Sequence, residues 1–406
     1  MPLRITNEAN RCLQCKRPLC REGCPARTAI PQVIALFREN RLLEAGKMLF
    51  DNNPMSLVCS IVCDHMAQCT GHCVLNRKGH PVHFYEIERF VSDAYLDRMT
   101  IERVPFNGKT AAVIGSGPAG MTAAIMLARG GYGVTIFEEK DRIGGMMQYG
   151  IPEFRLPKTI LDRYKARLLE MGVCIRPHVV MGGDLMIDNL FRDGYRTVFI
   201  ATGVWRPSTL GIEGETLANV HFGISYLARP ISYSVGQTVA VVGMGNVAMD
   251  VARTAFRHGA QRVMLFERAD KSPASPHEIE YAQLDGAEFY FRKSVSRITP
   301  EGPVFCSSVL DAQGRVVGTE SDEELVKADT TIIAINQRPK DKLVNTTHGL
   351  EASEKGLLIV DENNMTTRPG VFAAGDVVHG SLTVVHAVND AKNAAAAMMR
   401  YMENNG

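Results

Sequence analysis

One pattern restricts the fold of this 406-residue chain more than any other feature, because it occurs twice: a short apolar strand, a glycine-rich turn, a helix and a second strand. The first copy covers residues 109–138 and the second covers residues 237–267. The pattern predicts strands over 109–114, 134–138, 237–242 and 262–267, and helices over 121–130 and 249–258. Strand–helix–strand units of this kind build doubly wound parallel sheets, so we expect an α/β fold with two Rossmann-like dinucleotide-binding domains.

The first turn carries glycine at the three positions that a dinucleotide site needs, Gly115, Gly117 and Gly120. Such a turn lets the backbone approach a pyrophosphate, and it directs the phosphates to a helix N-terminus, where free N–H groups and the helix dipole favour negative charge. Glu138 ends the next strand, where an acidic side chain accepts hydrogen bonds from the adenosine ribose. A tight turn without a ligand would also use glycine, but the strand, helix and acid in register favour a nucleotide.

The second turn, residues 243–248, is an accepted variant of the same pattern, with Ala248 in the third glycine position. Its second strand ends at Glu267, whose carboxylate would hydrogen-bond an unmodified ribose and repel a 2′-phosphate, which favours NADH over NADPH. Arg268 is adjacent and would partly offset that repulsion, unless it is a solvated surface arginine. The predicted contacts of the nicotinamide cofactor are Gly243, Gly245, Asn246, Glu267 and Arg268.

Two dinucleotide sites in one chain indicate a flavin and a nicotinamide cofactor, because hydride transfer between them uses both. Gly144 and Gly145, the run IATG at 200–203 and the run FAAGDV at 372–377 resemble the FAD-binding segments of the flavoprotein family that includes thioredoxin and glutathione reductases. That resemblance implies that Gly145, Gly375 and Asp376 contact FAD, with Asp376 at the ribitol. Gly375 and Asp376 alone would suit a β-turn at a strand end equally well.

Eight of the ten cysteines precede residue 74, which separates a cysteine-rich head from the nucleotide-binding body. Their spacings are C-x2-C-x4-C-x3-C-P and C-x3-C-x5-C-x3-C, at Cys12, Cys15, Cys20, Cys24, Cys59, Cys63, Cys69 and Cys73. Eight thiols in a reducing compartment favour metal sites over disulfides. Two zinc sites fit the count, but iron–sulfur clusters have the stronger rationale beside a flavin, because a hydride delivers two electrons and clusters carry them singly. Cys174 and Cys306 are solitary, so we expect no dithiol that the flavin could reduce.

The composition excludes several other classes of protein. Hydrophobic residues make up 45% of the chain and charged residues 22%, as in globular proteins, and the formal charge is +1. No one-signed field exists to attract a nucleic acid or an anionic membrane. Residues 1–10 lack the apolar core of a signal peptide, and glycines interrupt the most apolar stretch, 111–127, so we expect a cytoplasmic protein without a membrane segment.

Five segments carry a more specific resemblance: RCLQCKRPLCREGCP, NNPMSLVCSIVCDHMAQCTGHC, YGIPEFRLPK, VAMDVART and FAAGDVV. Through them nearly the whole chain resembles the family of the glutamate synthase small subunit and the N-terminal half of dihydropyrimidine dehydrogenase. Its size and layout are most similar to the PreT-type subunits of bacterial NAD-dependent dihydropyrimidine dehydrogenase. The resemblance implies two [4Fe-4S] clusters with interleaved ligands, one held by Cys12, Cys15, Cys20 and Cys73 and the other by Cys24, Cys63, Cys69 and Glu88. Counting thiols alone leaves a rival set open, in which Cys59 completes the second cluster and Glu88 is a surface residue.

NADPH-using members of that family have arginines after the second acid and again a few residues beyond it. This chain has Glu267 and Arg268, and then Ser-Pro-His-Glu at 275–278. The departure favours NADH and weakens the identification with glutamate synthase. The predicted domains are a helical iron–sulfur domain over 1–105, an FAD domain over 106–224 and 340–406, and an inserted NAD(P)H domain over 225–339.

The predicted function is that of an electron-input subunit in a hetero-oligomer, which oxidises NADH through FAD and passes electrons through two [4Fe-4S] clusters to a catalytic partner subunit. Pyrimidine reduction is the first candidate for that partner, and glutamate synthesis or another reductase is the second. The alternatives are a self-contained NAD(P)H:acceptor oxidoreductase and a zinc-headed binding protein with vestigial nucleotide sites. We expect no general acid or base, because cofactor geometry and electronics supply the hydride step.

Overall fold

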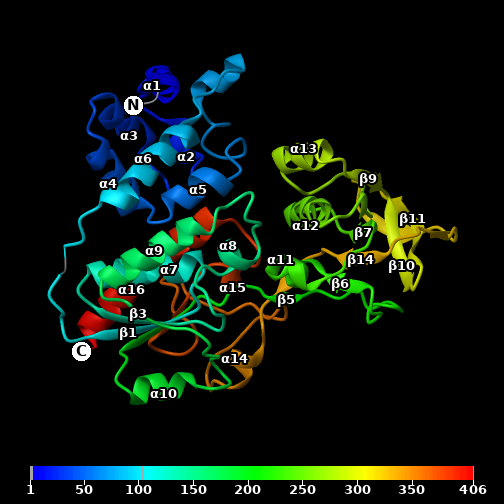
Figure 1. The fold of residues 1–406 in the computed structure, drawn as a ribbon. Coiled ribbons are helices and arrows are strands. Elements are labelled where there is room, and N and C mark those ends of the chain that lie inside the picture. Colours follow the sequence, from blue (N-terminus) through cyan, green and yellow to red (C-terminus); the bar gives the residue numbers. More distant parts are fainter. Residues whose placement is uncertain (1–2, 103, 406) are drawn as a thin grey trace. The chain divides into compact units, whose positions relative to one another are not determined.

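The computed structural model describes residues 3–102 and 104–405 and divides into two compact units (Figure 1). The first unit comprises Met1–Gln148, Glu153–Val204 and Pro339–Gly406, and the second comprises Tyr149–Pro152 and Trp205–Arg338. Each unit is described by itself below.

Short helices form the cysteine-rich head of the first unit: α1 (Leu3–Asn10), α2 (Leu19–Glu22), α3 (Ile30–Arg38), α4 (Leu42–Asn52), α5 (Ser56–Val62), the 3-10 helix η1 (Val74–Lys78) and α6 (Phe84–Arg98). Apolar residues at helical spacing, such as Val33, Phe37 and Leu49, pack with Ile87 and Val91 of α6 into one core. The helical character predicted for the head is confirmed, and Pro31 lies in the first turn of α3. The loops before, between and after these helices carry most of the cysteines.

A five-stranded parallel sheet forms the body of the first unit, in the order β16-β4-β1-β2-β3. Its strands are β1 (Thr110–Ile114), β2 (Gly133–Phe137), β3 (Cys174–Arg176), β4 (Thr197–Ile200) and β16 (Val371–Ala373). The central strands read as continuous apolar runs because both faces of the sheet are covered. The associated helices are α7 (Pro118–Arg129), α8 (Met146–Tyr149), α9 (Thr159–Glu170), α10 (Ile187–Arg192), α14 (Lys342–Asn345), α15 (Asp376–His379) and α16 (Val384–Asn404).

Helices cover the two faces of this sheet differently. The helices α7 and α16 pack side by side on one face, while α10 and α14 contribute to a core on the other face (Figure 1). The head lies on the side of α9 and α16, because α6 packs against α9 and α5 packs against α16. The cysteine-rich head and the first parallel sheet are therefore parts of one compact unit.

The second unit contains another five-stranded parallel sheet, in the order β6-β14-β7-β8-β9. Its strands are β6 (Val220–Phe222), β7 (Thr238–Val242), β8 (Arg262–Glu267), β9 (Glu288–Phe291) and β14 (Thr330–Ile333). Helices pack against one face of this sheet. The unit also contains the 3-10 helix η2 (Pro230–Ser232). The α-helices of this unit are α11 (Gly223–Ala228), α12 (Asn246–Arg257) and α13 (Pro276–Leu284).

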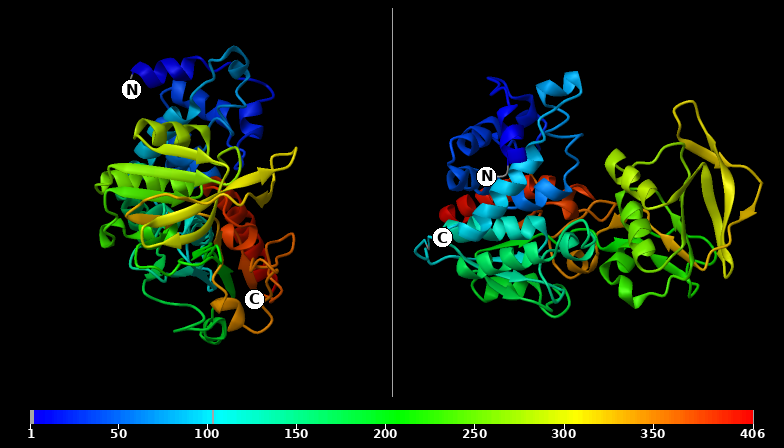
Figure 2. Two further views of the ribbon diagram at one scale, coloured as in Figure 1. Left: turned by 90° about the vertical axis from the view of Figure 1, so that its right-hand side faces the viewer. Right: turned by 45° about the horizontal axis from the view of Figure 1, so that its top comes forward.

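Antiparallel strands cover the other face of the second sheet (Figure 2). They are β10 (Lys293–Thr299), β11 (Gly302–Leu310), β12 (Val316–Thr319) and β13 (Glu324–Leu325). Phe305 of these strands stacks on Phe266 of β8. Where the chain enters and leaves this unit, β5 (Arg206–Pro207) pairs with β15 (Gln337–Arg338) in antiparallel fashion.

The predicted α/β fold class with a helical head is confirmed, and the four predicted strands lie within one residue of their expected bounds. Both helices that follow the glycine turns begin three residues earlier than expected, at Pro118 and Asn246, because the last part of each turn already forms the first helical turn. The alanine run at 394–397 lies inside α16. In the described part of the chain, no helix combines the length and apolar character needed to cross a membrane.

Candidate functional site

The glycine turn after β1 is shaped by close backbone contacts. A Cβ atom at Gly115, where φ is +94°, would lie 2.6 Å from the carbonyl oxygen of Ala201, and a Cβ atom at Gly120 would lie 2.0 Å from that of Gly115. Gly117 differs, because its nearest neighbour would be the Cα atom of Gly145 at 4.0 Å. Packing thus requires glycine at two of the three positions, while the third leaves open space at the N-terminus of α7, where a pyrophosphate would approach.

The acid that follows β2 is buried and already connected to this turn. Glu138 is 6% exposed, and its Oε2 atom accepts a hydrogen bond from the backbone N–H of Ser116 at 2.9 Å and another from the Ser116 hydroxyl. Ser116 also binds the next predicted segment, because the Gly144 N–H donates to its carbonyl oxygen at 3.0 Å. A carboxylate accepts about four hydrogen bonds, so Glu138 retains capacity for a ribose. The sequence analysis did not single out Ser116, although its place inside the turn was the available signal.

The C-terminal FAD-type segment reaches the same edge of the sheet. Because β1, β2, β4 and β16 are parallel, Gly115, Glu138 and Gly375 all follow carboxyl ends of strands, which is where open α/β sheets bind ligands. Asp376 begins α15 and its Oδ1 atom accepts a hydrogen bond from the Leu382 N–H at 3.2 Å. Burial raises the pKa of Asp376 to about 6. The structure therefore brings together every residue predicted to contact FAD.

In the turn after β7, one glycine position is enclosed by backbone atoms and the other is open. A Cβ atom at Gly243, where φ is +108°, would lie 2.5 Å from the carbonyl oxygen of Ala334, whereas one at Gly245 would meet nothing within 4 Å. Glu267 is half-buried at the end of β8, and its carboxylate accepts a hydrogen bond from the Ala269 N–H at 3.3 Å. Asn246 and Arg268 are exposed. The predicted nicotinamide-cofactor contacts thus share one edge of the second sheet.

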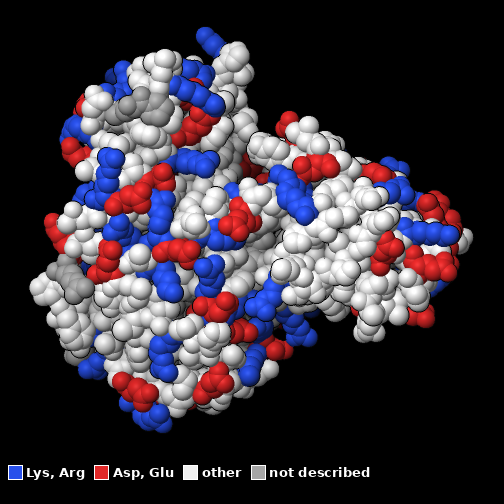
Figure 3. Space-filling view, in the orientation of Figure 1, with Lys and Arg blue, Asp and Glu red and all other residues white. Residues whose placement is uncertain are grey.

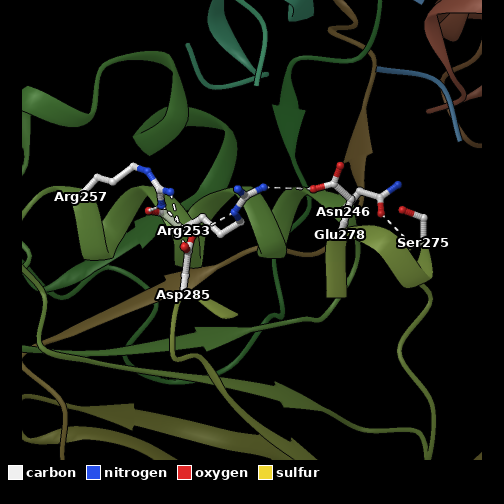
Figure 4. Close-up of polar contacts among 6 residues, drawn as sticks. All are labelled: Asn246, Arg253, Arg257, Ser275, Glu278 and Asp285. Atoms are coloured by element: carbon white, nitrogen blue, oxygen red, sulfur yellow. Dashed lines mark hydrogen bonds and ion pairs between the residues drawn. The ribbon is translucent and has the colours of Figure 1, made fainter. Parts of the chain in front are cut away.

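A buried arginine fastens α13 to α12 beside this turn (Figure 4). Arg253 is 8% exposed and contacts both ends of α13, with its Nη1 atom 3.5 Å from Oε2 of Glu278 and its Nε atom 3.1 Å from Oδ2 of Asp285. Its guanidinium also lies 4.9 Å from the centroid of the Tyr281 ring, and Arg257 pairs with Asp285 at 2.7 Å. A buried charge needs such partners, so Arg253 fixes α13 along its whole length.

The segment between β8 and α13 is attached to the glycine turn itself. The Oδ1 atom of Asn246 accepts a hydrogen bond from the Ser275 N–H at 2.9 Å (Figure 4). The Ser272 hydroxyl donates to the Met244 carbonyl oxygen at 2.7 Å. Asn246, predicted as a binding residue, therefore has a structural contact as well. Arg253 was not predicted from the sequence, where the available signal was an arginine between the small residues Ala252 and Thr254 in the middle of this helix.

Five cysteines line one apolar cavity of the head, and one of them is Cys69. We call the other four the first thiol group: Cys12, Cys15, Cys20 and Cys73. All four are partly exposed. Burial, together with the neighbouring thiols of Cys73, Cys12 and Cys15, raises the pKa of Cys20 to about 12. The backbone N–H of Val82 donates a hydrogen bond to the Cys73 sulfur at 3.4 Å.

The second thiol group consists of Cys24, Cys63, Cys69 and the carboxylate of Glu88. Glu88 lies on α6, is 6% exposed, and has no hydrogen-bond or ion-pair partner within residues 3–102 and 104–405. Burial raises its pKa well above the ordinary value. Burial also raises the pKa of Cys24 and Cys69, and the Glu88 carboxylate raises both further. A buried carboxylate without a partner is costly, and it suits a position where a metal supplies the missing charge.

Cys59 lies beside the second thiol group rather than away from it. It is buried in α5, one helical turn before Cys63, and the two side chains are hydrogen-bonded. The position of Cys59 is therefore compatible with the rival ligand set, in which Cys59 completes the second cluster. Among the described residues, no three Cys, His, Asp or Glu side chains converge on a point that would hold a single metal ion.

The second thiol group borders the dinucleotide-binding body of the first unit. Tyr164 of α9 is fully buried, its hydroxyl is bonded to the Leu57 backbone, and it lies near Cys59 and Glu88. On the other side, the Lys392 ammonium of α16 donates to the Asn52 side chain at 3.1 Å and lies near Cys24. The sequence analysis identified neither Tyr164 nor Lys392, because nothing in the sequence shows which body helices meet the head.

Ion pairs hold the head against the body. Arg163 of α9 contacts Asp93 at 2.7 Å and Asp97 at 2.8 Å, and Arg129 of α7 contacts Asp51 at 2.6 Å. On the face drawn in Figure 3, basic and acidic side chains are interspersed within each unit, in keeping with the formal charge of +1.

Comparisons with known proteins agree with this geometry. Residues 109–391 match the pyridine nucleotide-disulphide oxidoreductase family, and residues 2–100 match dihydropyrimidine dehydrogenase domain II, 4Fe-4S cluster. The glutamate synthase [NADPH] small chain of Escherichia coli is 32% identical over 98% of this chain and 91% of its own length. The NAD-dependent dihydropyrimidine dehydrogenase subunit PreT of Salmonella typhimurium is 32% identical over 99% of this chain and 95% of its own.

Solved structures show the same fold in the body. FprA from Mycobacterium tuberculosis superposes with a TM-score of 0.62 at 18% identity, covering 74% of this chain and 85% of its own. Thioredoxin reductase from T. acidophilum gives a TM-score of 0.57 at 20% identity, covering 73% of this chain and 98% of its own.

Proposed function

The chain belongs to the pyridine nucleotide-disulphide oxidoreductase family and is an NAD(P)H-dependent flavin and iron–sulfur oxidoreductase, and on that premise we propose that it is an electron-input subunit that oxidises NADH and delivers the electrons to a catalytic partner. The observation that carries the proposal is the position of the second thiol group. Its buried, unpartnered Glu88 lies among three cysteines where the head meets the flavin-type sheet. Electrons from the body would enter the head there.

The residues at the edge of the first sheet fit FAD. Gly117 leaves space for the pyrophosphate at the start of α7. The Glu138 carboxylate is hydrogen-bonded to Ser116 within the turn, and Asp376 follows the carboxyl end of β16. When bound, FAD takes a hydride as an electron pair, and iron–sulfur clusters carry electrons one at a time. The chain itself supplies binding and orientation, and none of its side chains needs to move a proton in the hydride step.

For the nicotinamide cofactor we propose NADH. Glu267 stands at the end of β8, where its carboxylate would accept hydrogen bonds from an unmodified ribose and repel a 2′-phosphate. The adjacent Arg268 is exposed, so it can turn toward solvent. Stopped-flow bleaching of the flavin with NADH and with NADPH tests this choice, and faster bleaching by NADPH would overturn it.

For the head we propose two [4Fe-4S] clusters, one on each thiol group, with Glu88 as the fourth ligand of the second. In Glu88→Ala one cluster signal should be lost or altered in electron paramagnetic resonance spectra, while Cys59→Ala should keep both. The opposite result, with a cluster lost only in the cysteine variant, would assign Cys59 as the ligand. Glu86→Ala is the matched control, because Glu86 lies on the same helix but pairs with Arg4.

For the partner we propose the substrate-reducing subunit of a dihydropyrimidine dehydrogenase, since the similarity to the Salmonella PreT subunit spans both chains almost completely. The second candidate is the large subunit of a glutamate synthase, because the small chains of that enzyme are equally similar. Purification of the tagged chain from its native host distinguishes the two, because the protein that copurifies in stoichiometric amount identifies the substrate.

The absorption spectrum with metal analysis tests the proposal as a whole. We expect one flavin and about eight irons per chain. Zinc without a flavin band would contradict it and support a zinc-headed binding protein. Rapid turnover with quinones in the absence of any partner would favour a self-contained oxidoreductase.

A further inference from the structure

The first thiol group lies in a basic part of the head surface. Lys16, Arg17 and Arg21 flank Cys15 and Cys20, and all three are exposed. On the other chain segment, Arg77 and Lys78 follow Cys73 and are exposed as well. Arg38 is also exposed and lies close enough to Cys12 to favour its thiolate. We call these six cations the basic collar.

The cations of the collar are unusual because they have no counterions. Across the described residues of the head, none of the six forms an ion pair or a side-chain hydrogen bond. Five of the seven basic residues elsewhere in the described part of the head are paired, for example Arg4 with Glu86 at 2.6 Å and Arg27 with Glu22 at 2.8 Å, while Arg89 and Arg98 of α6 are not. The acidic neighbours Glu8 and Glu39 are themselves occupied, by Arg11 and Arg41. The local positive charge is therefore uncompensated, although the whole chain is close to neutral.

Two large apolar side chains lie exposed within the collar. Leu13, between Cys12 and Cys15, is 60% exposed, and Leu19, next to Cys20, is 43% exposed. Both also line the cavity of the first thiol group. Interfaces of transient complexes combine a small apolar centre with a charged rim, and this surface has that composition.

We propose that the basic collar, with Leu13 and Leu19 at its centre, is the docking surface for a redox protein or subunit whose electron-accepting face is acidic. The proposal rests on the proposed function, because it assumes that electrons leave through the head. The second thiol group is no alternative exit, since Glu88 and Cys69 are buried and the body packs beside them. Each NADH oxidised to NAD⁺ releases one proton and two electrons, so two molecules of a one-electron acceptor are reduced.

The test uses two haem proteins of opposite charge as probes, acidic cytochrome b5 and basic cytochrome c, with NADH and the loaded, full-length protein. We expect cytochrome b5 to be reduced faster at low ionic strength, and its rate to fall steeply as salt rises, because opposite charges steer association. In Lys16→Glu/Arg17→Glu that rate should fall about 10-fold or more at low salt, while the rate with cytochrome c rises. Arg77→Glu/Lys78→Glu, on the other segment, should have the same effect.

A matched control changes the net charge equally at exposed lysines outside the head, in Lys327→Glu/Lys355→Glu. If the control shifts the acceptor preference as much as the collar variants do, or if the collar variants leave it unchanged, the docking proposal is wrong. Iron content and flavin bleaching by NADH are measured in every variant. Absence of bleaching in the wild type would instead contradict the proposed function, so the two failures are distinguishable.

Discussion

The two dinucleotide-binding sheets have equivalent strand orders, yet their glycine turns are surrounded very differently. In the first, the acid Glu138 is buried and bonded to Ser116 inside the turn, and the C-terminal segment adds Asp376 at the same edge. In the second, Glu267 is half-buried, Asn246 is exposed, and the position of Gly245 faces open space. The first turn is built into the core of its unit, whereas the second remains accessible at its edge.

This difference matches the two roles that a flavin reductase needs. A cofactor that stays bound through many turnovers is best held by buried contacts, whereas a nucleotide that enters and leaves in every cycle needs an open site. The same strand–turn–helix pattern thus serves a resident and an exchangeable ligand, and the surroundings of the turn decide which. The predictions below compare matched changes in the two units.

Gly120→Ala should have the largest effect. The new methyl group would lie 2.0 Å from the carbonyl oxygen of Gly115, so the turn must open or α7 must move. We expect FAD to be lost and the melting temperature to fall sharply, measured by flavin absorbance after gel filtration and by calorimetry. The matched change in the second unit is Ala248→Gly, which should keep FAD and cost about 1 kcal/mol through the helix. Retention of full FAD by Gly120→Ala would show that the first turn is not rigid.

Gly245→Ala should have a smaller and more selective effect. Its methyl group would meet no protein atom within 4 Å, so folding and FAD content should be unchanged. The methyl group would instead occupy the approach of the cofactor pyrophosphate to α12, and we expect the KM for NADH to rise about 10-fold or more. Steady-state kinetics with a one-electron dye measures this, and an unchanged KM would mean that the nucleotide binds elsewhere.

Arg253→Met should weaken nucleotide binding without touching the nucleotide. It removes the ion pair with Glu278 and one of the two arginines that hold Asp285, and so loosens the segment that Asn246 and Ser272 attach to the turn. We expect the KM for NADH to rise about 3- to 10-fold at unchanged kcat, with partial rescue in Arg253→Lys. Arg262→Met removes an exposed pair with Glu288 in the same unit and should change neither constant. A fall in kcat at unchanged KM would contradict the role of Arg253 in holding the segment beside the nucleotide-binding turn.

The sequence predicted the parts of this architecture that depend on local pattern. The glycine turns, the strands around them and the acids Glu138 and Glu267 follow from spacing alone, because each depends on a few neighbouring residues. The contacts of Ser116, Arg253 and Tyr164 were not predictable in this way. Each joins segments far apart in the chain, and only the packed structure shows that Tyr164 of the body lies beside Glu88 of the head. The antiparallel strands over 293–325 were missed because they follow neither pattern.

The last expected effect concerns stability against pH and depends on Asp376 in the first unit, since the outer strand of the second sheet is followed by Gly223 instead of an acid. Burial raises the pKa of Asp376 from 3.8 to about 6 in the folded protein. The folded state therefore holds this proton more tightly than the unfolded chain, and its stability falls as pH rises from about 4 to about 6, by up to about 3 kcal/mol. Flavin-free Asp376→Asn should lack that loss, so its urea midpoint relative to the wild type should be higher at pH 7 than at pH 4.5. The exposed Asp193→Asn is the control, and a pH dependence that survives in Asp376→Asn would assign the loss to another group.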